Sequence, residues 1–416
     1  MITEGTRCGG LCRALFLVAL GCPVAVPAAD WGEQSLEVQV DVRYASTDVE
    51  RSFTQGGLGL GRFDEDHDGP QLGRLSLEYR GALTETLGAH VTADTYADHD
   101  KNPIDLTEAF LEWRPYPSSA WRWRTKLGAF YPPISLENRD TGWRSSYSLS
   151  PGAINTWLGE ELRTIGAESS FTWLGSRTDK GVDLSLIGAL YGWNDPLGVE
   201  IFERGWAIHD RQTGLFGGLP KIFADSTSRH QVEFFHEIDN RPGYYLGAQA
   251  SWPERLVLRV LHYDNRGDPR ASNGYEKAWL TRFDSAGLRF EWQPDWTLIA
   301  QWMNGDTAVG ASADGLGFLR TAFESYFGLV SGVFGPHRLT VRYDRLTTNT
   351  LRGEAYFDGY QDANGWTFGY GFDFGNGWQL WIEGLQVKGE LEQRSLLGLD
   401  PDFRERTLQC AFRFRY

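Results

Sequence analysis

The chain ends on an alternating stretch, residues 408–416, which reads Leu408-Gln409-Cys410-Ala411-Phe412-Arg413-Phe414-Arg415-Tyr416. Because side chains of a β-strand point alternately to opposite faces, this stretch predicts a strand with one apolar, aromatic face and one mainly polar face. In a soluble sandwich the apolar face would meet a core. In a membrane barrel it would meet lipid, while the arginines would meet a watery interior. Both folds are all-β, and the rest of the chain decides between them.

Alternating segments of about ten residues recur along the whole chain, as expected for strands and not for helices. Clear examples are residues 36–44, 74–80, 121–130, 339–343 and 366–374. In the last segment one face carries five aromatic side chains: Trp366, Phe368, Tyr370, Phe372 and Phe374. Such a face suits lipid and its interfaces better than water. We therefore predict a transmembrane antiparallel β-barrel, which with both ends on one side needs an even number of strands.

The connections between these segments are of two kinds. Short ones, often beside tryptophan, lie at residues 112–115, 251–254, 292–295, 335–336 and 375–377. Long ones, rich in Asp, Gly and Asn, lie at residues 46–71, 132–160, 194–228, 265–280 and 304–320. This pattern predicts short periplasmic turns beside an interfacial tryptophan girdle, and long extracellular loops.

The strand count is 16–18, because about seventeen segments read clearly as strands. The odd number arises between Tyr191 and a predicted strand at Val232, where the connection should be periplasmic but is too long for a turn. A weak strand within residues 205–216 would give eighteen strands, and one misassigned strand would give sixteen. Either size leaves a water-filled lumen.

The N-terminus reads as an export signal. Residues 1–28 contain Arg7 and Arg13, then a short apolar run, then small residues before Asp30, so we predict a signal peptide cleaved after residue 28 or 29. Residues 29–416 then form a single barrel domain in the cell outer membrane of a Gram-negative bacterium. Cys410 is the one cysteine of the mature chain, which excludes an intrachain disulfide. The net charge of -15 argues against nucleic acid as a partner.

One predicted strand carries a basic ladder on a single face, formed by Arg122, Arg124 and Lys126. On the preceding strand Glu108 and Glu112 share a face. Antiparallel pairing about a tight turn would place Glu112 near Arg122 and Glu108 near Lys126. Two interpretations remain open: a ladder that conducts anions, or a salt-bridge lattice that stiffens the wall. By the same alternation we place Arg338 and Arg342 on the interior face.

The loop that follows this ladder is predicted to fold inward and narrow the barrel. It covers residues 132–160 and has a high content of aliphatic and aromatic side chains for an exposed loop, which burial against the wall would explain. Its charged residues, which we expect to line the constriction, are Glu137, Arg139, Asp140, Arg144, Glu160 and Glu161.

This layout resembles the phosphate-selective porin family of outer-membrane channels. The resemblance rests on a third hairpin, a Phe/Pro/Pro turn at residues 130–133, the following Leu136-Glu137, and a long third loop. It implies a homotrimeric pore narrowed by residues 132–160, with basic residues facing the eyelet. The loop lacks the family's run of arginines and lysines, which argues against phosphate selectivity. Tyr416 replaces the usual terminal phenylalanine but keeps an aromatic ring with a carboxylate, so we expect the barrel-assembly machinery to recognise this strand.

We expect neither a cofactor nor a metal. Residues 64–69 resemble the first half of a calcium loop, with Asp64, Asp66 and Asp68 at alternate positions, but Leu75 stands where the strongest ligand belongs. A solvated acidic loop tip, which could bridge lipopolysaccharide through divalent ions, is the simpler interpretation.

The sequence thus favours passive diffusion of small polar or ionic solutes through a water-filled pore lined by charges of both signs. Such a protein is not an enzyme. Two alternatives stay open at this point: an outer-membrane barrel enzyme or receptor, and a secreted soluble β-sandwich that binds a ligand.

Overall fold

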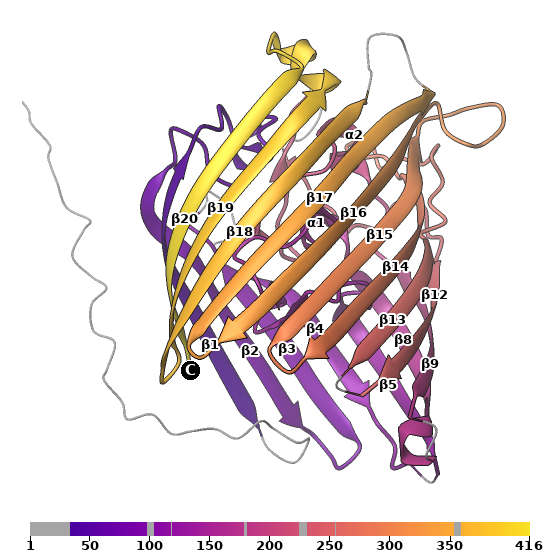
Figure 1. The fold of residues 1–416 in the computed structure, drawn as a ribbon. Helices are drawn as coiled ribbons and strands as arrows, with labels where there is room; N and C mark the ends of the chain where they lie inside the picture. Colours follow the sequence, from indigo (N-terminus) through magenta and orange to yellow (C-terminus); the bar gives the residue numbers. More distant parts are fainter. Residues whose placement is uncertain are drawn as a thin grey trace, which may run out of the picture.

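A computed structural model describes residues 34–97, 104–117, 119–178, 181–223, 231–253, 255–352 and 359–416. Sixteen antiparallel strands form one closed barrel, in which each strand pairs with the next one in the chain and the first pairs with the last (Figure 1). The prediction of an all-β barrel is confirmed. The alternative of a two-sheet soluble sandwich is wrong, because the sheet closes on itself.

The barrel strands are β1 (Ser35–Thr47), β2 (Gly69–Ala82), β3 (Leu87–Thr95), β4 (Ile104–Trp113), β5 (Trp121–Phe130), β8 (Thr164–Leu174), β9 (Asp183–Gly192), β12 (Gly243–Trp252), β13 (Leu256–Asp264), β14 (Leu280–Gln293), β15 (Trp296–Val309), β16 (Leu319–Phe334), β17 (His337–Arg352), β18 (Gln361–Gly375), β19 (Trp378–Leu391) and β20 (Asp402–Arg415). Two small sheets, β6 (Asn138–Asp140) with β7 (Arg144–Ser145) and β10 (Leu219–Pro220) with β11 (Gln231–Val232), lie outside this order. The helices are α1 (Ala153–Glu161) and α2 (Val199–Glu203), with short 3-10 turns at Phe53–Gln55, Gly175–Thr178 and Glu392–Leu397. None of the described helices is long and apolar enough to cross a membrane.

The strand count settles at sixteen because the predicted strand at Val232 does not belong to the barrel. Val232 pairs with Leu219 in the small β10–β11 sheet. Residues 205–216 form no strand either, and β9 pairs directly with β12. The connection from Gly192 to Gly243 therefore lies with the other long loops, at the end of the barrel that we call the loop end. The short turns, the first residues of β1 and the last residues of β20 lie at the opposite end, which we call the turn end.

The closing strand behaves as its alternation predicts. Leu408 and Phe412 are 55% and 45% exposed on the outer face, whereas Ala411 and Arg413 are buried at 0% and 3% exposure on the inner face. The register Val42↔Phe412 and Asp41↔Arg413 joins β20 to β1 and closes the barrel. Trp366, Phe368 and Phe374 are likewise exposed on the outer face of β18, while Thr367 between them is buried.

Candidate functional site

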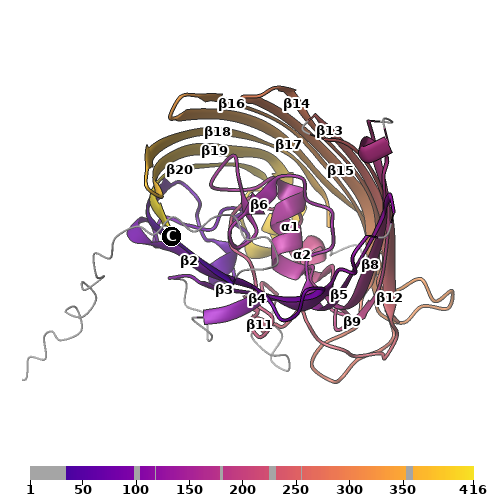
Figure 2. The same cartoon turned by 90° about the horizontal axis from the view of Figure 1, so that it is seen from below.

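Three long connections fold back into the barrel, so the lumen is largely filled by protein. They are residues 48–68, 131–163 and 193–216, and Figure 2 shows α1 and α2 inside the ring of strands. All nine residues of α1 are buried. The inward fold predicted for residues 132–160 is therefore confirmed, and two further inward segments join it. We call residues 131–163 the constriction loop.

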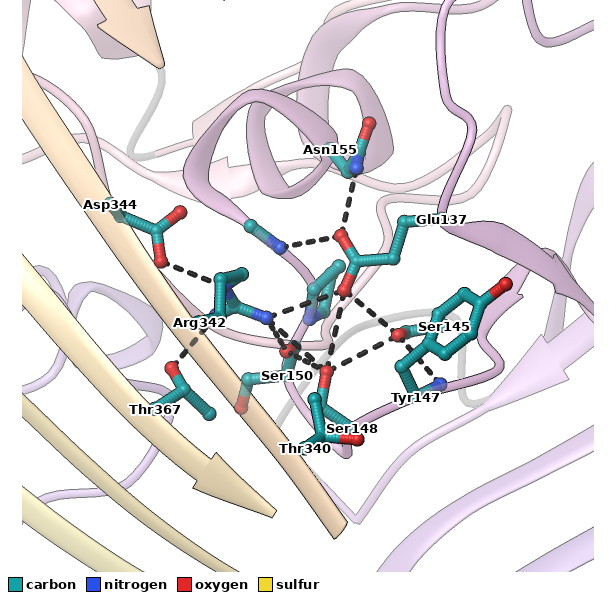
Figure 3. Close-up of polar contacts among 12 residues, drawn as sticks. Glu137, Ser145, Tyr147, Ser148, Ser150, Asn155, Thr340, Arg342, Asp344 and Thr367 are labelled. Atoms are coloured by element: carbon teal, nitrogen blue, oxygen red, sulfur yellow. Dashed lines mark hydrogen bonds and ion pairs between the residues drawn. The ribbon is translucent and has the colours of Figure 1, made fainter. Parts of the chain in front are cut away.

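Arg342 on β17 fastens the constriction loop to the barrel wall (Figure 3). Its guanidinium donates to the Ser150 carbonyl at 2.6 Å, and lies 2.7 Å from an Asp344 carboxylate oxygen and 3.3 Å from the Glu137 carboxylate. Arg342, Glu137 and Asp344 are all buried. Buried charges need partners of this kind, because the low-dielectric interior makes an unpaired charge costly.

The same two carboxylates hold the start of α1. Glu137 accepts from the N–H of Gly152 at 2.9 Å, and Asp344 accepts from the N–H of Ala153 at 3.1 Å. The first N–H groups of a helix have no partner within the helix, and negative charge there is stabilising. Glu137 also accepts from the Asn155 side chain at 2.9 Å. One acid from the loop and one from the wall thus fix the position of α1 in the lumen.

Other wall residues bind the backbone of the constriction loop. Glu383 on β19 accepts from the N–H groups of Leu149 at 2.7 Å and Ser150 at 3.0 Å. Arg259 on β13 donates to the carbonyls of Pro133 and Ser135. Because Pro132 and Pro133 cannot donate to a strand ladder, β5 ends before them and the chain turns inward.

An arginine cluster lies across the lumen, where β1, β2 and β20 face the loop. Asp41 is within 3.1 Å of three guanidinium groups, those of Arg43, Arg144 and Arg413. Asp210, from the third inward segment, lies 2.8 Å from Arg43 and 3.3 Å from Arg62, and Arg74 pairs with Asp94 at 2.8 Å. Five arginines therefore face these three aspartates, and two further acids border the cluster: Asp140 lies 3.9 Å from Arg413, and Glu78 accepts from the Gly142 N–H at 2.8 Å.

Two members of the cluster outside the barrel strands, Arg144 and Asp210, have shifted pKa values. Burial, together with the nearby Arg74 and Arg413, lowers the pKa of Arg144 to about 10 even though Asp41 opposes the shift. Burial alone would raise the pKa of Asp210, but Arg43, Arg62 and Arg74 outweigh it and hold that pKa below its usual range. Both groups stay charged at neutral pH.

The gap between the loop and the cluster is a cavity of about 10 Å³, the size of one water molecule. Its lining includes Arg74, Arg144 and Arg413, together with Asn155, His209 and Asp210. The Nε of Arg144, the Oδ1 of Asn155 and the Nδ1 of His209 are buried and have no hydrogen-bond partner. The gap thus lies between the constriction loop, the third inward segment and the arginines of the wall.

A close approach at Gly142 brings the loop against β2. Gly142 has a φ of +69°, and its carbonyl accepts from Arg74. A Cβ at this position would lie 2.5 Å from the Ser76 hydroxyl. Only glycine fits such a left-handed conformation in contact with a wall.

The structure places the predicted basic ladder at the turn end of the lumen with a different pairing. Glu112 lies opposite Lys126, not Arg122, because residues 114–120 form a long connection and pairing starts at Trp113↔Thr125. Lys126 is 3.5 Å from Glu168, and Arg124 is 4.0 Å from Glu112.

The other two residues of the predicted pairing, Arg122 and Glu108, have different neighbours. Arg122 lies opposite Thr172 and is exposed. Glu108 lies 3.5 Å from His90 and accepts from the N–H of Tyr131 at 3.2 Å. Lys126 is near enough to act on Glu108 electrostatically, as predicted, although the register places Lys126 opposite Glu112.

Other predicted residues are divided between the two ends of the lumen. Asp140 pairs with Arg415 at 2.9 Å, Arg139 is exposed, and Arg338 donates to Ser331 at 3.1 Å. Glu160 and Glu161 do not face an open eyelet, because they bind the third inward segment.

The calcium candidates have other roles. Asp64 is buried and accepts from the Ser52 N–H at 2.9 Å, while His67 lies 2.6 Å from it. Asp66 and Asp68 are exposed at the tip of the loop.

Sequence reasoning missed Arg62, Asp210, Arg204 and His209 as luminal residues. All four lie in irregular connections, where no alternation reports which way a side chain points. The apolar side chains of residues 193–216, among them Leu197, Ile201 and Ile208, were a usable signal, because apolar side chains in a long loop indicate burial.

No protein-family model matches the chain, and no curated protein matches it. Solved structures with similar folds do exist. The outer membrane channel DcaP of Acinetobacter baumannii is 11% identical, with a TM-score of 0.54 over 94% of this chain and 100% of that one. OmpF of Salmonella typhi, in complex with daunomycin, is 11% identical, with a TM-score of 0.53 over 93% and 98% of the two chains.

The anion-selective porin of Comamonas acidovorans is 13% identical, with a TM-score of 0.50 over 92% of this chain and 99% of that chain. Similarity at this level concerns architecture alone. The chain has the closed 16-strand barrel fold of the outer-membrane porins.

Proposed function

We propose that this protein is an outer-membrane porin that lets small polar or ionic solutes diffuse passively through its lumen. The observation that carries the proposal is a closed barrel with an apolar, aromatic outer face and a charged inner face, crossed by a constriction loop. Lipid can surround such an outer face, and only polar solutes have a path along the inner one.

The charges along the path favour small anions over cations of the same size. Four arginines (Arg74, Arg144, Arg211 and Arg413) and one aspartate (Asp210) line the narrow gap, and at the turn end Arg122 is exposed and Arg124 half-buried. Excess positive charge in a low-dielectric passage raises the local concentration of anions. This preference is general for anions; the constriction loop offers no phosphate-specific run of cations.

The test is conductance of the purified protein in a planar lipid bilayer under a KCl gradient. We expect discrete conductance steps and a reversal potential whose sign reports chloride as the more permeant ion. A protein that inserts as a folded barrel but gives no steps would overturn the function. Steps with a potassium preference would overturn the anion preference and leave the channel function in place.

The cellular setting belongs to the same proposal. We place the loop end outside the cell and the turn end in the periplasm, with the barrel-assembly machinery recognising β20 and lipopolysaccharide surrounding the loop end. Residues 1–28, the proposed signal peptide, lie outside the described part of the chain. N-terminal sequencing of the protein from outer-membrane fractions should find Ala29 or Asp30 first, and an intact Met1 would contradict export by cleavage.

We also propose a homotrimer, as the family resemblance implies. An apolar hollow of about 1250 Å³ on the outer face offers a contact surface, since Ala248, Ala250, Ala286 and Ala300 line it between larger aromatic side chains. Small side chains let two apolar surfaces approach closely. Native mass spectrometry in detergent should report three chains, and a monomer at all concentrations would contradict the trimer.

A further inference from the structure

The third inward segment, residues 193–216, crosses the lumen from wall to wall. On one side Leu197 accepts from the Thr281 hydroxyl of β14 at 2.5 Å, and Trp206 donates to the Thr347 carbonyl of β17 at 3.1 Å. On the other side Leu215 donates to the Leu106 carbonyl of β4 at 2.7 Å. We call residues 193–216 the lid, because they bridge opposite walls of the barrel beside α1 (Figure 2).

Two adjacent glutamates at the end of α1 hold the lid. Glu161 accepts from the backbone N–H of Gly198 at 2.5 Å and of Glu200 at 2.7 Å. Glu160 lies 2.7 Å from Arg204 and 2.7 Å from the Nε2 of His209. Every one of these lid partners comes from residues 193–216, so we call Glu160 and Glu161 the latch.

Two glutamates at this end of α1 do not stabilise the helix by themselves. Negative charge at the C-terminal end of a helix is unfavourable, because the helix dipole is negative there. The last turn of α1 contains no basic residue that would compensate. Arg163, two residues beyond the helix, donates to the Leu158 and Gly159 carbonyls of that turn, and the lid supplies the partners of the two glutamates themselves.

Some buried groups of the lid destabilise its closed position. Glu200 Oε1 and Glu203 Oε2 are buried without a hydrogen-bond partner. Buried polar atoms without partners oppose the closed arrangement, and water would satisfy them once the lid moved away. The apolar part of the contact is a cluster around Trp157 and Trp206, whose ring centroids lie 5.8 Å apart. The apolar packing therefore stabilises the closed position of the lid, and the buried polar atoms without partners destabilise it.

We propose that the lid is a gate, and that solutes wider than water pass only after the latch of Glu160 and Glu161 has released it. This gate rests on the proposed channel function. The closed arrangement leaves a gap of about 10 Å³ beside the lid, between His209, Asp210 and the arginine cluster. His209, Asp210 and Gln212 line that gap and all belong to the lid. Movement of the lid would therefore remove the three side chains from the gap together.

A reversible crosslink between α1 and the lid gives the direct test. A Cβ built on Gly159 would lie 3.2 Å from the Cγ of Gln212, close to the spacing of a Cβ and the far sulfur in a disulfide. The variant Gly159→Cys/Gln212→Cys is made in a Cys410→Ser background, since Cys410 is the free cysteine of the described chain. Each single cysteine variant, oxidised in the same way, is the control.

We expect conductance of the oxidised double variant to fall at least tenfold below that of the same protein after reduction, with the disulfide verified by peptide mapping. Equal conductance in the oxidised and reduced states would overturn the gate while leaving the channel intact. Absence of conductance in the wild type and in every variant would overturn the channel function and the gate with it.

The latch itself is tested by Glu160→Gln. We expect the open fraction in single-channel records to rise several-fold, because Arg204 loses its charged partner. Glu65→Gln, on an exposed loop tip, is the matched control and should leave the open fraction unchanged. An open fraction of Glu160→Gln equal to that of the wild type would overturn the latch.

Discussion

Val341 and Arg342 are neighbours on β17 with opposite surroundings. Val341 is 42% exposed on the outer face, opposite Phe368 of β18 and Val330 of β16, whereas Arg342 is fully buried in the lumen and binds the constriction loop. The outer face needs only the right polarity at alternate positions. The inner face needs particular partners from loops far away in the sequence. An outer residue can therefore be replaced by another apolar residue, whereas an inner residue such as Arg342 cannot be replaced without loss of its partners.

The largest effect is expected from Arg342→Ala, which breaks the inner network. The change leaves Glu137 and Asp344 buried without their guanidinium partner. Breaking a buried ion pair in this way costs about 3–5 kcal/mol of unfolding free energy. Denaturant unfolding in detergent micelles, followed by tryptophan fluorescence, measures the loss. Arg122→Ala, at an exposed position, is the control; equal stability of the two variants would show that the network is dispensable.

The variant Val341→Arg tests the outer face. A charged side chain facing lipid costs about 2–4 kcal/mol near the bilayer midplane. The same unfolding measurement should show a loss somewhat smaller than that of Arg342→Ala. Val341→Leu preserves polarity and should stay within about 0.5 kcal/mol of the wild type. If Val341→Arg proved harmless, lipid would not cover this face.

These two neighbours also mark what the sequence could predict. Alternation identified the outer face, the closing strand and the inward direction of Arg342, because a strand in a barrel repeats every two residues. It could not identify the pairing of Glu112 with Lys126, since the length of the 114–120 connection shifts the register. Nor could it place Arg62 next to Asp210, because these residues come from irregular loops separated by a large part of the chain.

Titratable side chains at the contact between α1 and the lid make the stability of the closed state depend on pH. Burial raises the pKa of Glu161 to about 8, with Glu160 adding to the rise while backbone N–H groups of the lid and Arg204 oppose it. Burial also raises the pKa of Glu203 to about 7 and lowers the pKa of His209. Ionised Glu161 and Glu203 and protonated His209 are therefore all less stable in the closed lumen than in water.

The sign of the pH dependence follows from these shifts. A raised carboxyl pKa stabilises the closed state fully below its ordinary value, and that stabilisation is lost as pH rises toward about 8. His209 opposes this trend only below its ordinary pKa of about 6.5. Between pH 6.5 and 8 we expect the open fraction to rise by up to about tenfold per pH unit and then to level off. Glu161→Gln should flatten the rise; an unchanged slope in that variant would exclude Glu161 as its source.

The smallest effect is expected at the turn end. Arg124 is 38% exposed and lies 4.0 Å from Glu112, so solvent and salt screen its charge. Arg124→Ala should shift the chloride-to-potassium permeability ratio by less than about twofold and should leave stability unchanged. Reversal potentials at low and high salt measure the shift. A loss of selectivity larger than that of Arg144→Ala would place the selective step at the ladder instead of at the arginine cluster.

The central claim is that solutes travel along the inner face of the barrel and not along the outer one. Arg124→Cys and Trp123→Cys place a thiol on adjacent residues that face opposite sides of β5, in a Cys410→Ser background. A charged, membrane-impermeant thiol reagent added from the turn side should reduce the single-channel conductance of Arg124→Cys and leave that of Trp123→Cys unchanged. Equal sensitivity of the two variants, or an unaffected Arg124→Cys with the modification verified by mass spectrometry, would contradict the claim.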